Sequence, residues 1–269
     1  MKMKDNLLNS MSGESASTTT ILPMAPLRDI VVFPKQTFSF LVGRKKSINA
    51  MTEAMGTAKT VFLATQKNSD IEDPLDNEIN RYGAIGEIRE LIHLPDGTAK
   101  VIVEGKSRAQ VKRIIPDENF SRVEIELLEE REAPAAEATA LCRSIIRRLE
   151  THAEQNEQLP QGFVKHVAAI SNPSHLADAV AVKFPFKFED QLRLLESADV
   201  CGRLHLLLEL IEIEIEINNV EQQIENRAKK QLERRQKDYY LKEKIRALKK
   251  EIGDEGEADN ELSEIEKKI

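Results

Sequence analysis

The spacing of hydrophobic positions in this chain changes near residue 130. Before that point apolar and polar residues alternate over short runs, as in 123–127, where Val, Ile and Leu are separated by two glutamates. A period of two is typical of half-buried β-strands. After it, apolar residues recur every three or four positions, which is the helical period. The first such stripe is Ala138, Leu141, Ile145, Leu149 and Ala153. The pattern predicts a β-rich domain over 21–130 and a helical subdomain over 131–198.

The β-rich part is expected to hold six or seven short strands and one helix over 44–55. The run 26–34 is rich in β-branched residues and is closed by a proline. Pro95-Asp96-Gly97 separates two strand-like runs, and this tripeptide favours a tight turn because proline presets φ and glycine accepts a positive φ. A second turn is expected at Gly105. The segment therefore predicts a small, partly closed sheet.

The longest predicted element is a helix over 199–252. No proline interrupts it, and at about 1.5 Å per residue it would measure roughly 80 Å. The run 211–217 alternates strictly between Ile and Glu, which is a strand pattern, but no turn residue bounds it and both flanks are helical. The alternation also resolves into two apolar helix faces. We therefore expect a helix whose first part, 204–224, is buried and whose remainder is solvated.

Composition and charge narrow the class of protein. The 269 residues carry a net charge of −7, with 32% charged residues and no tryptophan. No run approaches the ~20 apolar residues of a membrane span. The two cysteines do not form a disulfide framework, which favours a reducing cytoplasm. Residues 1–20 lack a signal-peptide pattern and are expected to be a disordered leader. Residues 253–269 are expected to be an acidic loop and the start of a further helix.

The search for catalytic, cofactor and metal motifs predicts none of these sites. Gly105-Lys106-Ser107 resembles the end of a phosphate-binding loop, but Lys100 stands where that motif needs glycine, and strands flank it on both sides. The five histidines are scattered and show no zinc-ligand spacing. No Gly-x-Ser-x-Gly sequence is present.

Two groups of residues are candidates for contacts with a polypeptide substrate. The first is Phe33, Pro34, Phe38 and Phe40, which lie on short strands and offer an apolar patch for extended chains. Their alternative role is the domain core, where phenylalanine is usually buried. The second group is Tyr239 and Tyr240, the aromatic residues of the basic segment 227–250.

The basic segment offers an alternative function. Residues 227–250 hold eleven Lys and Arg against three acids, a net charge of +8, whereas 251–269 has a net charge of −6. A nucleic-acid-binding module would use such a segment to contact phosphates, with weak DNA binding as the expected result. A solvated helix face explains the same charges, because acids precede bases by four residues along it.

Several stretches resemble the N-terminal region of bacterial Lon, the ATP-dependent AAA+ serine protease. In the β-rich part they are Leu22-Pro23, Pro26–Pro34, Val42-Gly43-Arg44, Ser47-Ile48, Leu94–Val101, Val103–Gly105 and Arg108-Ala109. In the long helix they are Lys229-Lys230-Gln231, Gln236, Tyr239-Tyr240-Leu241, Glu243, Ala247 and Lys250–Gly253. The resemblance covers nearly everything after residue 21. Lys106, Ser107, Lys242 and Lys244 stand where the family varies.

The resemblance implies a fold and a function. The fold class is α+β: a PUA-like β pseudo-barrel, an α-helical subdomain and a very long helix leading to an ATPase. The function is substrate recognition and hexamer organisation in a cytoplasmic protease that degrades misfolded and regulatory proteins. Its partners are unfolded or degron-bearing proteins and other Lon subunits in a homohexamer, with no membrane. ATP and Mg²⁺ serve the full-length enzyme. The family's Ser-Lys dyad lies further along the sequence, so residues 1–269 alone are expected to be inactive and to hold no cofactor.

Overall fold

A computed structural model describes residues 20–155, 159–160 and 162–251. The expected leader over 1–20 (apart from Thr20) and the acidic segment 253–269 lie outside the described residues. The chain divides into two compact units, the first ending at Glu214 and the second beginning at Ile215. The longest helix, over 200–251, passes through that boundary.

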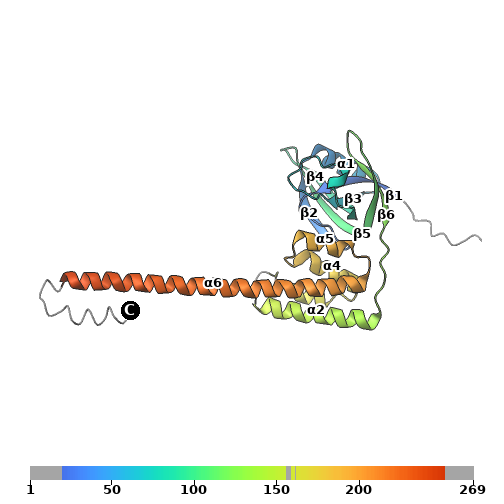
Figure 1. Cartoon of the computed structure of the whole chain (residues 1–269). Coiled ribbons are helices and arrows are strands. Elements are labelled where there is room, and N and C mark those ends of the chain that lie inside the picture. Colours follow the sequence, from blue (N-terminus) through green and yellow to red (C-terminus); the bar gives the residue numbers. More distant parts are fainter. Residues whose placement is uncertain (1–19, 156–158, 161, 252–269) are drawn as a thin grey trace, which may run out of the picture. The chain divides into compact units, whose positions relative to one another are not determined.

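The first part of the chain folds into a six-stranded mixed sheet (Figure 1). Its strands are β1 (Thr20–Leu27), β2 (Thr37–Val42), β3 (Thr60–Thr65), β4 (Tyr82–His93), β5 (Ala99–Ile115) and β6 (Arg122–Leu127). The strand order is β2-β5-β4-β3-β1-β6, and β6 also pairs with β5. That last pairing closes a ring of five strands, while β2 pairs only with the first part of β5. All pairs are antiparallel except β1 with β3.

Two glycines of the β4–β5 hairpin have different roles. Gly97 takes the expected positive φ of 85° in the turn, and Asp96 accepts a hydrogen bond from the Thr98 amide at 2.9 Å. Gly105, where a second turn was expected, instead lies inside the continuous strand β5. A Cβ atom built on Gly105 would lie 2.1 Å from the Phe33 carbonyl oxygen. The glycine therefore allows the 33–36 backbone to cross β5, and the turn prediction at this position was wrong.

The interior of the ring is filled by apolar residues from every strand and from one helix. Helix α1 (Lys45–Gly56) buries Ala50, Met51 and Ala54 against the sheet. Two clusters of buried side chains form the core, one containing Met51 and the other containing Phe62. A short 3-10 turn, η1 (Asp76–Glu78), lies in the loop between β3 and β4. Helix α1 thus has its N-terminus directly after β2 and its apolar face on the core.

Within the described residues, five helices follow the sheet. They are α2 (Ala135–Gln155), α3 (Phe163–Ala168), α4 (Pro173–Lys183), α5 (Phe188–Glu196) and α6 (Val200–Glu251). Figure 1 shows α4 and α5 between the sheet and the first turns of α6, with α2 beside α6. Ion pairs Glu137–His205 and Arg148–Glu212 join α2 to α6 in the same order along both helices, so the two run parallel. None of the helices in the described residues has an apolar stretch suited to crossing a membrane.

Helix α6 confirms the helical interpretation of the alternating Ile/Glu run at 211–217. Its burial is shorter than expected, however. Leu204, Leu207 and Ile211 are fully buried, but Ile213 is 45% exposed and Ile224 is 59% exposed. The prediction of a buried first third to residue 224 was therefore wrong, because Ile211 is the last buried residue of α6 among the residues whose burial is described.

A buried cluster of charges connects the sheet with the helices. Arg108 on β5 pairs with Asp178 on α4, and its Nη1 donates to Glu130 at 2.9 Å. Arg203 on α6 lies 3.5 Å from the same aspartate and donates to Glu130 at 2.9 Å and to the Ser174 hydroxyl at 2.9 Å. Both arginines and Asp178 are at most 2% exposed. Buried charges persist only when paired, so this cluster holds β5, α4 and α6 in one arrangement.

Candidate functional site

Strand β2 is the edge strand of the sheet. It pairs with β5 from Thr37–Glu104 to Val42–Ala99, and no other strand of the described residues pairs with its second side. In the described part of the chain, the backbone groups of 37–42 hydrogen-bond to nothing except β5. An edge strand leaves a row of N–H and C=O groups that can pair with a further extended chain. This row is the first component of the site.

Two adjoining cavities lie beside this edge, with volumes of about 400 and 320 Å³. They share the residues Pro26, Gly43, Arg44, Ser47 and Glu72 and so form one groove. The smaller cavity is lined by apolar residues, among them Leu27, Ile30 and Phe40, and also by Arg28, Arg44 and Glu72. The larger one has a polar rim that includes Lys45, Lys46, Asp73 and Asp76. We call the two cavities together the β2 groove.

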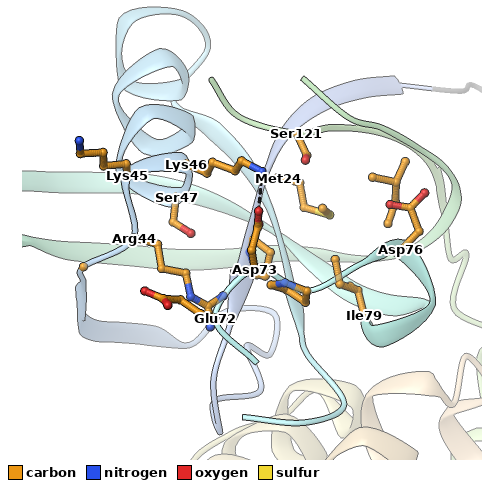
Figure 2. Close-up of a pocket in the computed structure, with 14 residues that line it drawn as sticks. Met24, Arg44, Lys45, Lys46, Ser47, Glu72, Asp73, Asp76, Ile79 and Ser121 are labelled. Carbon is orange, nitrogen blue, oxygen red and sulfur yellow. Dashed lines mark hydrogen bonds and ion pairs between the residues drawn. The ribbon is translucent and has the colours of Figure 1, made fainter. Parts of the chain in front are cut away.

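The polar end of the β2 groove is the N-terminus of α1 (Figure 2). Arg44 is the N-cap and makes no side-chain cap, and the first helical bond runs from the Ile48 amide to the Arg44 carbonyl at 2.9 Å. Among the described residues, no partner is present for the amides of 45–47. The Ser47 side chain is 3% exposed and lines both cavities. Free amides at a helix N-terminus attract hydrogen-bond acceptors and negative charge.

Arg44 fixes the loop that forms the opposite wall. Its Nη2 donates to the Gln66 side chain at 2.7 Å and to the Ile71 carbonyl at 3.1 Å. Burial lowers the pKa of Arg44, as does the nearby Arg28 charge, while Asp73 and Glu72 oppose that shift. Lys46 pairs with Asp73 at 2.7 Å, but both side chains are well exposed, so this pair contributes little energy and opens readily.

The groups that line the groove and its edge are suited to binding a polypeptide. The groove and the edge of β2 together offer a row of backbone groups, apolar side chains set among polar ones, and the unpaired amides at the start of α1. No histidine or cysteine is among the described residues that line either cavity. An extended polypeptide suits this combination, because main-chain hydrogen bonds supply affinity and side pockets supply selectivity.

The structure separates the residues that the sequence suggested as substrate contacts. Phe33 and Pro34 are buried, and Phe33 is fully enclosed in the core. Phe40 is 9% exposed and lines the groove, while Phe38 is half-buried on the same strand. Tyr239 and Tyr240 are exposed on α6, in the second unit. Contact of any of these residues with a substrate stays a prediction.

Sequence reasoning missed most of the groove. Leu41 is 66% exposed beside Phe40 and lines the smaller cavity, yet it was not among the residues that the sequence suggested as substrate contacts. The Gly43-Arg44 pair was noted only for its resemblance to Lon. The available signal was the position of a basic run, Arg44–Lys46, at the start of a predicted helix, which places positive charge beside free amides.

Comparisons with known proteins agree with this architecture. Residues 21–213 match the substrate-binding domain of ATP-dependent protease La (Lon). Lon protease 1 of Syntrophobacter fumaroxidans is 41% identical over 263 residues, covering 98% of this chain and 32% of that protein. Lon protease of Syntrophomonas wolfei subsp. wolfei is 36% identical over 259 residues, covering 96% of this chain and 32% of that protein. The chain thus spans about a third of the length of these relatives.

A solved structure confirms the fold. The N-terminal domain of the Mycobacterium avium complex Lon protease aligns with a TM-score of 0.61 and 21% identity, over 72% of this chain and 98% of that one. The predicted α+β class, a β pseudo-barrel followed by helices and a very long C-terminal helix, is therefore correct. On the evidence of the 21–213 match and of the relatives, the chain belongs to the Lon protease substrate-binding domain family.

Proposed function

We propose that this chain recognises protein substrates for a Lon-type ATP-dependent protease by binding extended polypeptide in the β2 groove. The observation that carries the proposal is the free edge of β2 beside a groove that is lined by both apolar and polar residues. Unfolded proteins expose both backbone groups and apolar side chains. In folded proteins these backbone groups are already paired and these side chains are already buried. The groove should therefore prefer unfolded proteins to folded ones, whatever their sequence.

The expected affinity is modest. Each main-chain hydrogen bond contributes about 0.5–1.5 kcal/mol, and a partly buried apolar side chain adds about 1–2 kcal/mol. Immobilising a flexible peptide offsets much of this gain. One groove should therefore bind in the micromolar range, and several grooves in one assembly would reach higher avidity on a long substrate.

For the whole protein we propose the activity that the relatives' name indicates. The relatives called Lon protease are about three times as long as this chain. In that setting the protein is a cytoplasmic homohexamer that uses ATP and Mg²⁺ and cleaves peptide bonds with a Ser-Lys dyad. Its substrates are misfolded and degron-bearing proteins, and the present chain delivers them to the motor.

The experiment is a titration of the chain against a fluorescently labelled, permanently unfolded protein, followed by anisotropy. The test variant is Leu41→Ser, which removes exposed apolar surface from the groove, and the matched control is Leu127→Ser on β6, where the leucine is also exposed. Leu41→Ser should weaken binding about 5- to 30-fold, since the lost contact is worth about 1–2 kcal/mol. Equal affinities for the two variants would contradict the assignment to the groove, and absent binding by the unmodified chain would contradict the function itself.

A further inference from the structure

Three potential metal ligands meet on the surface of the helical subdomain, away from the β2 groove. Glu137 lies in the first turn of α2, and Cys201 and His205 lie in the first two turns of α6. One ligand atom from each, a carboxylate oxygen, a sulfur and a ring nitrogen, lies within 4.8 Å of both others. Glu137 Oε1 is 3.3 Å from His205 Nε2, and the Cys201 thiol donates a hydrogen bond to the same carboxylate.

The spacing of these residues explains part of this convergence. Cys201 and His205 are four residues apart, so their side chains lie one above the other on the same helix face. The sequence analysis predicted no metal site because it found no histidine at zinc-ligand spacing, and it overlooked the four-residue spacing of Cys201 and His205. The Cys-x-x-x-His spacing was the only signal in the sequence, and on its own it is weak.

Backbone hydrogen bonds join the segment that precedes α2 to the residues at the start of α6. The Arg131 amide donates to the Ala198 carbonyl at 3.0 Å, and the Val200 amide donates to the Arg131 carbonyl at 3.1 Å. Asp199 caps α6 by accepting from the Gly202 amide at 3.0 Å. Arg203, between the two proposed ligands of α6, is anchored in the buried charge cluster. The backbone positions of Glu137, Cys201 and His205 are therefore set by this framework, and not by the contacts among the three side chains themselves.

We propose that Glu137, Cys201 and His205 form a Zn²⁺ site, with water as the fourth ligand. A thiolate and an imidazole favour zinc over magnesium or calcium, which prefer all-oxygen sites. Zinc-ligand distances are about 2.0–2.3 Å, so the ligand atoms must close to roughly 3.3–3.8 Å from one another, a movement that side-chain rotation supplies. The Cys201 thiol proton is released to solvent when the metal binds.

The site is accessible and has a structural consequence. The Glu137 and His205 side chains are about half exposed, so an ion reaches them from solvent without unfolding. Bound zinc would replace a weak surface ion pair with metal-ligand bonds between α2 and α6. This link joins the first turns of the two helices, and the chain should therefore become more stable when zinc is present.

The test uses the whole chain, stripped of metal with a chelator and dialysed against zinc. One equivalent of Zn²⁺ should bind, and Co²⁺ as a probe should give a sulfur-to-metal charge-transfer band. Zinc at a hundred times its dissociation constant should raise the Tm by roughly 5–10 °C. The variants Cys201→Ser, His205→Ala and Glu137→Gln should each weaken zinc binding at least about tenfold, since even outer partners of metal ligands contribute that much.

Matched controls are available in the same subdomain. Cys142→Ser removes the other cysteine and His166→Ala removes a histidine elsewhere, and both should bind zinc as the unmodified chain does. Far-UV circular dichroism of the metal-free variants shows whether each is folded. The proposal is overturned if folded Cys201→Ser binds zinc as tightly as the unmodified chain, if the cobalt band survives that substitution, or if Cys142→Ser lowers affinity equally. These outcomes leave polypeptide binding at the β2 groove unaffected.

Discussion

The substitution Asp178→Asn tests whether the buried charge cluster holds the sheet and the helices together. Asp178 is 0% exposed and pairs with Arg108, which is 2% exposed, while Arg203 lies 3.5 Å away. Asparagine keeps the shape of the side chain but removes its charge, so no cavity forms and the effect is electrostatic. Two buried arginines are then left with Glu130 as their only carboxylate in this cluster.

The expected loss of unfolding free energy is about 3–5 kcal/mol, the usual cost of removing one partner from a buried ion pair. Urea unfolding followed by circular dichroism and by a second, size-sensitive probe measures it and shows whether the transitions coincide. The control is Asp190→Asn on α5, whose pair with Arg193 is exposed and should contribute at most about 1 kcal/mol. A loss below about 1 kcal/mol for Asp178→Asn, or one equal to the control, would refute this reasoning.

Three further predictions concern the barrel, the groove and pH. Gly105→Ala should lower stability by at least about 2 kcal/mol in urea unfolding, because its Cβ would lie 2.1 Å from a carbonyl oxygen; an unchanged midpoint would contradict this. Gly43→Phe should narrow the β2 groove, because Gly43 lines both of its cavities, and should leave the chain folded, since the nearest atom to a Cβ there is 3.8 Å away. Polypeptide affinity should then fall at least about fivefold in anisotropy titrations. Gly56→Phe, with open space around it, is the control. Burial alone would raise the pKa of Glu130, but the Ser174 hydroxyl and the two arginines together lower it below its ordinary 4.5. Its contribution to stability is therefore present above pH 4.5 and is lost as pH falls through the lower, folded pKa. Glu130→Gln should therefore cost more stability at pH 6 than at pH 3, and a difference that does not change with pH would be inconsistent with the shift.

The period of the hydrophobic pattern predicted the main architecture correctly. The change from two to 3.6 near residue 130 marks the end of the sheet, and the alternating run 211–217 is helical because no turn residue bounds it. The turn at Gly97 was also predicted correctly, from the tripeptide Pro95-Asp96-Gly97. These features depend on neighbours in sequence. Gly105 does not: its need for a small residue comes from the 33–36 backbone crossing it, which no local pattern reveals.

The parts of the candidate site that depend on long-range packing were not predictable. Which strand forms the edge follows from the closure of β6 onto β5, and that choice exposes Leu41 while it encloses Phe33. The extent of burial along α6 is set by where its neighbours end. The charge cluster joins Arg108 to Asp178 across 70 positions, and ordinary surface charges look the same in a sequence.

The most direct test of the central claim is amide hydrogen exchange of the whole chain with and without a permanently unfolded protein. If the β2 groove binds extended polypeptide, the amides of 37–47, which include the free edge and the first turn of α1, should exchange several-fold more slowly in the complex. The control segment is β6, whose amides should be unchanged. Protection confined to the basic segment 227–250, with none at 37–47, would contradict the account.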